Sequence, residues 1–100
     1  MCTLALWPAI GAAPVPRKAP EFTIKMPNNA APILLSQYRG KVVALEFLFT
    51  TCPHCQHAAQ LTSRLQTEYG PKGFQALGVA FNDMSHMLVF DFVRDYKVNY

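Results

Sequence analysis

The chain has 100 residues, about the length of one domain and enough for a modest hydrophobic core. Hydrophobic residues make up 51% of it and charged residues 15%, which excludes an intrinsically disordered chain. The net charge is only +3 and no basic run occurs, so no nucleic-acid partner is indicated. Three cysteines are too few for a disulfide-dense secreted scaffold.

Residues 1–17 are expected to form an arm outside the folded domain, which spans residues 18–100. The arm begins MCTLALWPAIGAAPVP and resembles the apolar and small-residue parts of a secretory signal peptide, although it lacks a basic lead. We therefore predict export, for example to a bacterial periplasm, with a disordered arm as the alternative. About a dozen apolar residues are too few to span a bilayer, so no stable membrane span is expected. Cys2 would be a lipid-attachment site only in a longer precursor.

The first folded elements are predicted from alternation and turn residues. Residues 21–26 (EFTIKM) alternate apolar and polar side chains, which indicates a short strand. Residues 27–32 (PNNAAP) are typical of a turn, and the segment that follows them ends at Gly40. Residues 41–49 (KVVALEFLF) are almost all apolar, which predicts a strand covered on both faces, as in a parallel sheet.

A helix is predicted from Pro53, a residue that suits the first turn, to Gly70, where a Gly-Pro pair ends it. Apolar residues recur along it at three- and four-residue spacing, which defines one helix face. The residues of this face are Ala58, Leu61, Leu65 and Tyr69.

Residues 73–82 (GFQALGVAFN) predict a second buried strand, and a second amphipathic helix follows it. Asp83 or Ser85 would be the N-cap of this helix. Its apolar face would consist of Leu88, Val89, Phe92, Val93 and Tyr96. Two buried strands joined by a helix imply a right-handed parallel crossover, so the predicted fold class is α/β. In such sheets the reactive crevice lies at the carboxyl ends of the strands, where Cys52 falls.

Cys52 and Cys55 form a C-x-x-C motif at the predicted start of the first helix, and several kinds of chemistry compete for it. Haem attachment needs histidine directly after the second cysteine, and Gln56 excludes it. A structural zinc site usually needs four ligands in two pairs, and the chain has nearby histidines but no second cysteine pair. A purely structural disulfide would close almost no loop and would add little stability.

Reversible disulfide exchange explains the motif better. The thiolate is the reactive form, and backbone N–H groups at a helix N-terminus depress the pKa of C-x-x-C thiols to roughly 3.5–7.5. We expect Cys52 at or just before the first helical residue with an accessible sulfur, and Cys55 one turn along, facing inward. Pro53 would support the helix start, and His54 could add positive charge or a hydrogen bond near the Cys52 sulfur.

Glu46 is a carboxylate inside an apolar run, where burial without a partner is costly. It precedes Cys52 by six residues in a strand that points at the pair, so it could lie beneath the two cysteines. Burial would raise its pKa and let it exchange protons with Cys55. The alternative is that Glu46 reaches an edge or an ion pair and has no role in the chemistry.

Together these residues resemble the TlpA/ResA-type thioredoxin-like oxidoreductases of the redoxin (AhpC/TSA) superfamily. The resemblance covers residues 18–100 through the blocks KAPEF, LSQYRGKVVALEFLFTTCPHC, YGPKGFQALGVAFND and VFDFVRDYKVNY. It implies a thioredoxin-like fold in which Cys52 is the nucleophilic cysteine and Cys55 the resolving one. It also implies that Glu46 occupies the buried acidic position of thioredoxins.

The chain departs from this family in three ways. Thr51 replaces the tryptophan that commonly precedes the first cysteine. Pro53-His54 is the dipeptide of DsbA-type oxidants. Reduction potentials range from about −270 mV for thioredoxin to about −120 mV for DsbA, so the direction of electron flow stays open. The family also continues past Tyr100 with a cis-proline loop, two strands and a helix. We therefore expect the N-terminal part of the fold (a β-hairpin-like start, then β-α-β-α) without the C-terminal β-β-α, and an incomplete catalyst.

The leading functional hypothesis is a thiol–disulfide oxidoreductase that acts on protein thiols and disulfides and needs no cofactor or metal. An open sheet edge would allow a homodimer to form by strand exchange. Three alternatives remain: a Sco-like copper or metal carrier that uses the cysteine pair and His86, a peroxiredoxin-type peroxidase, and a truncated domain without catalytic activity.

Overall fold

A computed structural model describes residues 14–100 of the chain. Most of the signal-like segment and Cys2 fall on residues 1–13, outside the described residues, so their predicted roles stay predictions. Between residues 14 and 100, neither helix combines the length and the apolar character that crossing a membrane requires.

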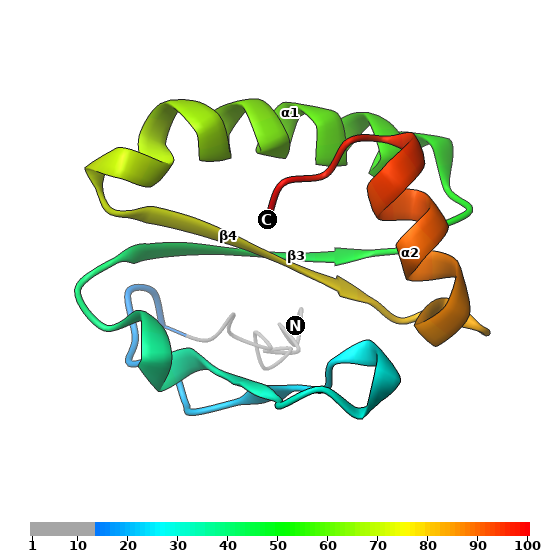
Figure 1. Ribbon diagram of the computed structural model, residues 1–100. Coiled ribbons are helices and arrows are strands. Elements are labelled where there is room, and N and C mark those ends of the chain that lie inside the picture. Colours follow the sequence, from blue (N-terminus) through cyan, green and yellow to red (C-terminus); the bar gives the residue numbers. More distant parts are fainter. Residues whose placement is uncertain (1–13) are drawn as a thin grey trace, which may run out of the picture.

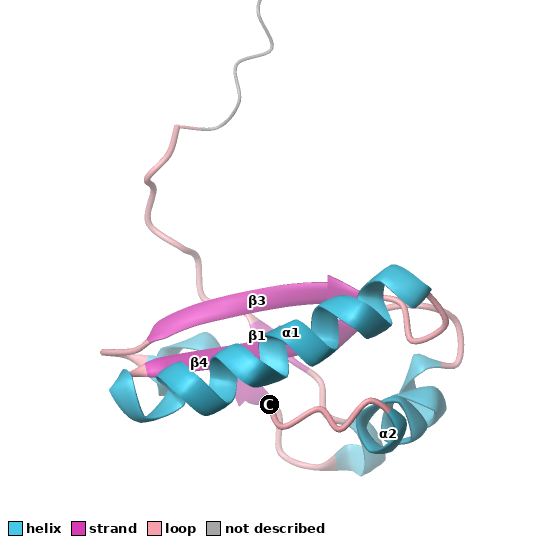
Figure 2. Ribbon diagram, turned by 90° about the horizontal axis from the view of Figure 1, so that it is seen from above, coloured by secondary structure: helices cyan, strands magenta, loops and turns pink. Residues whose placement is uncertain are grey.

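The centre of the fold is a parallel pair of strands, β3 (Val42–Leu48) and β4 (Phe74–Ala80), joined by helix α1 (Pro53–Tyr69). Their register runs from Val42 opposite Phe74 to Leu48 opposite Ala80. Helix α1 lies across one face of the two strands (Figures 1 and 2). The predicted β-α-β unit of an α/β fold is therefore confirmed, with boundaries close to the predicted ones.

A short antiparallel hairpin lies on the other side of the parallel pair from α1 (Figure 1). It consists of β1 (Thr23–Ile24) and β2 (Ile33–Leu34), with a 3-10 turn at Pro27–Asn29 between them. The first strand is shorter than the predicted range 21–26. The reason is that the register would place Lys25 opposite Pro32, which has no N–H to extend the ladder.

Glycine ends the segments that lead into both parallel strands. Gly40 and Gly73 have φ values of +85° and +90°, a left-handed conformation that glycine adopts without a steric cost. The carbonyl oxygen of Gly73 accepts a 2.8 Å hydrogen bond from the N–H of Val42. The two turns thus set where β3 and β4 start side by side, and the predicted stop at Gly40 is confirmed.

The prediction that β3 and β4 are covered on both faces is wrong. At their carboxyl ends, Phe47, Phe49 and Phe81 are 63%, 43% and 58% exposed. These rings pack on each other, with centroids 4.4 Å apart for Phe49–Phe81 and 6.3 Å for Phe47–Phe81. Side chains alternate between the faces of a strand, and within residues 14–100 the hairpin covers only part of the face opposite α1.

Helix α2 (Ser85–Asp95) lies at the carboxyl ends of the strands (Figure 1). The predicted N-cap is wrong, because neither Asp83 nor Ser85 occupies the cap position. Met84 occupies it with φ of +60° and makes no side-chain cap hydrogen bond. The helix is held instead by Phe92, which is 4% exposed and belongs to a small core cluster with Leu48 and Ala59.

Candidate redox site

The loop between β3 and α1 places Cys52 directly before the first helical residue. Cys52 is the N-cap residue of α1 in an extended conformation, and Pro53 occupies the first turn. The N–H of Cys52 donates to the carbonyl oxygen of Phe49 at 3.2 Å, which closes a tight turn. Its own carbonyl oxygen accepts the first helical hydrogen bond, from the Gln56 N–H at 3.0 Å. The predicted position of Cys52 is confirmed.

A side-chain clamp fixes this loop to the end of β4. The Asn82 Oδ1 atom accepts a 2.9 Å hydrogen bond from the Thr50 N–H, and Asn82 Nδ2 donates to Thr50 Oγ1 at 2.9 Å. Gln56 Nε2 also donates to the Thr50 carbonyl oxygen at 3.2 Å. Thr50 is buried, so these bonds satisfy polar groups that water reaches poorly. We did not predict the roles of Asn82, Thr50 and Gln56. The bonds between Asn82 and Thr50 join residues 32 positions apart, so no local pattern signals them.

The two cysteines of the motif are free thiols that approach each other to 3.8 Å. Cys55 packs against the core cluster of Leu48, Ala59 and Phe92, so it faces inward as predicted. The pKa of Cys52 is lowered, first by the backbone N–H of Cys55, then by the Cys55 thiol and the N–H of His54. All three groups donate toward a Cys52 thiolate and stabilise the charged form.

His54 contributes to this site through its backbone. Its side chain is exposed, and it is the N–H of residue 54 that lowers the pKa of Cys52. A contribution of the imidazole to the Cys52 thiolate therefore stays a prediction.

Alkylation of the reduced protein should label Cys52 before Cys55 and should do so below the pH at which a free thiol reacts. The lowered pKa of Cys52 means that its thiolate forms as pH rises through values below the free-cysteine pKa of about 8.5. Iodoacetamide labelling across this pH range, followed by peptide mass spectrometry, measures which cysteine is labelled first and the pH at which each one reacts. Preferential labelling of Cys55, or a Cys52 profile that follows free cysteine, would contradict the assignment.

Glu46 stands on β3 opposite Gly78 of β4 and on the same face as Leu48, which packs under α1. It is half-buried, and its Oε2 atom accepts a 2.8 Å hydrogen bond from the Tyr100 hydroxyl. Glu46 makes no ion pair with any residue between 14 and 100. Burial, and then the adjacent Glu46 carboxylate, raise the pKa of Tyr100, so its phenol stays a hydrogen-bond donor. Like Asn82, Thr50 and Gln56, Tyr100 has a role in this region that we did not predict.

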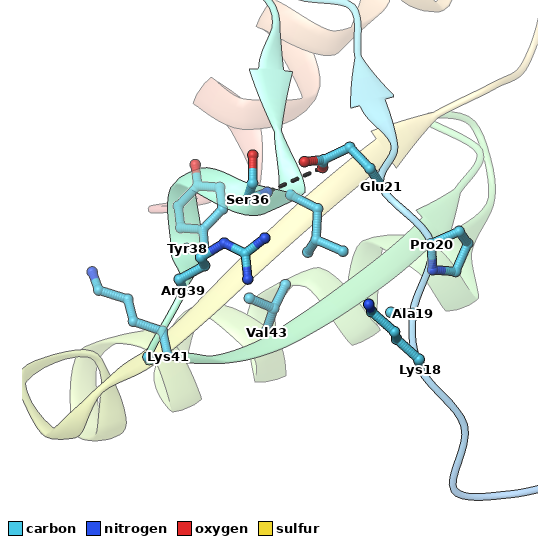
Figure 3. Close-up of a pocket in the computed structure, with 11 residues that line it drawn as sticks. Lys18, Ala19, Pro20, Glu21, Ser36, Tyr38, Arg39, Lys41 and Val43 are labelled. Carbon is cyan, nitrogen blue, oxygen red and sulfur yellow. Dashed lines mark hydrogen bonds between the residues drawn. The ribbon is translucent and has the colours of Figure 1, made fainter.

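Two hollows on the described surface, residues 14–100, lie at opposite ends of β3. A hollow of about 460 Å³ is lined by Phe49, Thr51, Phe81, Asn82, Asp83 and Leu88, next to the turn that carries Cys52. Another, of about 850 Å³, lies at the opposite end of β3, near Val43 (Figure 3). Lys18, Arg39 and Lys41 surround it, and Glu21 there accepts a 3.1 Å hydrogen bond from the Ser36 N–H. Neither cysteine lines it, so it lies apart from the redox chemistry.

The histidines do not join the cysteine pair as ligands. Within residues 14–100, no three side chains of His, Cys, Asp or Glu gather in a way that could hold a metal ion. His86, which the metal-carrier alternative requires, therefore has no such arrangement with Cys52 and Cys55 in this structure.

The β3-α1-β4 unit, with a C-x-x-C pair at the N-terminus of its helix, defines a thioredoxin-like α/β fold. The chain belongs to the AhpC/TSA family, whose pattern it matches over residues 15–100. The predicted membership of the redoxin superfamily is thereby confirmed. A comparison with curated proteins gave no match.

Solved structures with the same fold come from several bacteria. A thiol:disulfide interchange protein of the thioredoxin family from Chlorobium tepidum has a TM-score of 0.74 at 24% identity, covering 89% of this chain and 60% of that one. A protein of the same organism, provisionally assigned as thiol:disulfide interchange protein DsbE, has a TM-score of 0.66 at 28% identity, covering 78% of this chain and 53% of that one. A Bacteroides thetaiotaomicron protein, provisionally assigned as a protein disulfide isomerase, has a TM-score of 0.69 at 26% identity, covering 82% of this chain and 52% of that one. The chain spans little more than half the length of these structures.

Proposed function

We propose that the chain exchanges a Cys52–Cys55 disulfide with the thiols and disulfides of other proteins. The observation that carries the proposal is the asymmetry of the pair. Cys52 stands at the N-terminus of α1 with a lowered pKa, and Cys55 lies 3.8 Å away against the core. The names of the similar structures, two of them thiol:disulfide interchange proteins, support the same chemistry.

The reduced pair would reduce a substrate disulfide in two steps. The Cys52 thiolate attacks one substrate sulfur, a Cys52–substrate disulfide forms, and the other substrate sulfur leaves as a thiolate. Cys55 then loses its proton and attacks Cys52 Sγ, so the Cys52–Cys55 bond forms and the second substrate thiolate departs. Glu46 would take the proton of Cys55, because it stands on the strand face that packs under α1. The same steps in reverse oxidise a dithiol.

A glutathione redox titration tests the proposal. The fraction of the Cys52–Cys55 disulfide, measured by trapping and mass spectrometry, should follow a reversible two-electron couple. A potential near the thioredoxin value of about −270 mV indicates a reductant, and one near the DsbA value of about −120 mV an oxidant. Failure of the pair to form a reversible disulfide refutes the proposal. A peroxide-consumption assay on the same preparation measures the peroxidase alternative.

Two further parts of the proposal concern the setting of the reaction. We place the protein outside the cytoplasm, for example in a bacterial periplasm, and fusion of the N-terminal arm to a reporter enzyme tests export.

The two-strand parallel sheet in residues 14–100 has open edges, so we also propose a homodimer formed by strand exchange. Size-exclusion chromatography at several concentrations tests this, since a monomer at every concentration would exclude it.

A further inference from the structure

The C-terminal tail, residues 97–100, packs against β4 at Gly78. At Gly78, a Cβ atom would lie 3.3 Å from Tyr100 Cε2 and 3.6 Å from Leu48 Cδ2. A contact of 3.3 Å is tighter than most Cβ atoms make, so glycine at this position leaves the room that the phenol ring occupies. Gly78 is also the residue that pairs with Glu46 across the two strands.

Several hydrogen bonds hold the tail in this place. Asn99 Nδ2 donates to the Ser63 carbonyl oxygen at 3.2 Å and to Thr67 Oγ1 at 2.9 Å, both on α1. The N–H of Val98 donates to the carbonyl oxygen of Val93 at 3.0 Å. The approach of Tyr100 to Glu46 is therefore one contact of a tail that is bound along its length.

We propose that Tyr100 is a positioning residue of the Cys52–Cys55 site, which holds the Glu46 carboxylate in one orientation on the face of β3 that packs under α1. This proposal rests on the proposed function, because Glu46 matters there as the acceptor of the Cys55 proton. The geometry that carries it is the 2.8 Å bond from the Tyr100 hydroxyl to Glu46 Oε2, together with the space at Gly78.

The physical effect is a hydrogen bond in a half-buried place. A phenol that donates to a carboxylate oxygen holds that carboxylate in one orientation. Within residues 14–100, the titratable side chain that hydrogen-bonds to Glu46 is the Tyr100 phenol, and Thr62 lies beside the Tyr100 hydroxyl. Tyr100 thereby fixes the orientation of Glu46 on the face of β3 that packs under α1.

Tyr100→Phe removes the hydrogen bond and keeps the ring. The carbon-13 signal of the Glu46 carboxylate, followed by NMR of labelled glutamate side chains, should move because its hydrogen-bond donor is lost. Glu46→Gln identifies the Glu46 signal. The Cys55-dependent release of a mixed disulfide should slow by about tenfold, the loss expected when one hydrogen bond to a charged group is removed. Gly78→Ala, which crowds the ring, should move the Glu46 signal and slow release as well.

Tyr96→Phe is the matched control, because the Tyr96 ring packs against Phe92 with centroids 5.1 Å apart. It should leave the Glu46 signal and the rate of release unchanged. An unchanged Glu46 signal in Tyr100→Phe, or an equal change in Tyr96→Phe, overturns the proposal. If the glutathione titration instead finds no reversible couple, the proposed function fails, while the Glu46 signal still reports on the Tyr100 contact by itself.

Discussion

Replacing Cys55 with serine should trap the protein on its substrate as a stable mixed disulfide. Serine keeps nearly the same volume in the core contact but cannot attack Cys52 Sγ. Turnover of a protein disulfide should fall by about 1,000-fold or more, because release then depends on dilute thiols from solution in place of a thiol held beside the bond. In this structure Cys55 approaches Cys52 to 3.8 Å.

Cys52→Ser is the paired variant, and it should lose the first step as well as the second. Non-reducing gel electrophoresis and intact-mass measurement distinguish the two variants, since only Cys55→Ser should gain the mass of a bound substrate chain. The opposite result, a trapped complex with Cys52→Ser and none with Cys55→Ser, would exchange the two roles. A trapped complex also identifies the partner, because the substrate stays attached through one sulfur.

The parts of the fold that periodicity describes were predictable from the sequence. The helix that starts at Pro53 and the two apolar strand runs each carry their signal within a few neighbouring residues, and glycine or proline marks their ends. The position of Cys52 at the helix N-terminus follows from the same local pattern. Its extended N-cap conformation, with Pro53 in the first turn, agrees with that pattern.

The parts that depend on long-range contacts were not predictable. The bond between Tyr100 and Glu46 joins residues 54 positions apart, and that between Asn82 and Thr50 joins residues 32 apart. The prediction of the N-cap residue of α2 was wrong for a related reason. Asn82 is held by Thr50, and the Ser85 N–H donates to the Asn82 carbonyl oxygen at 3.0 Å, so the turn before α2 takes its shape from the clamp and places Met84 at the cap.

Phe92→Ala should be the most destabilising single substitution in α2. Truncation of a buried phenylalanine costs about 3–5 kcal/mol, and a chain of this size has a free energy of unfolding of only about 5–15 kcal/mol. The effect should be large here because the core cluster has few members, and Phe92 is the residue through which α2 joins it. Urea unfolding followed by circular dichroism measures the loss.

Phe90→Ala is the matched control, since Phe90 lies on the same helix and is 47% exposed. It should change the free energy of unfolding by less than about 1 kcal/mol. The pair also links the core to the chemistry, because Cys55 packs against the same cluster as Phe92. In Phe92→Ala, alkylation of Cys55 should accelerate toward that of Cys52, and in Phe90→Ala the order of labelling should stay as it is. Equal losses of stability in the two variants would show that Phe92 does not anchor α2, and slow labelling of Cys55 in a folded Phe92→Ala would show that something other than this cluster shields the resolving thiol.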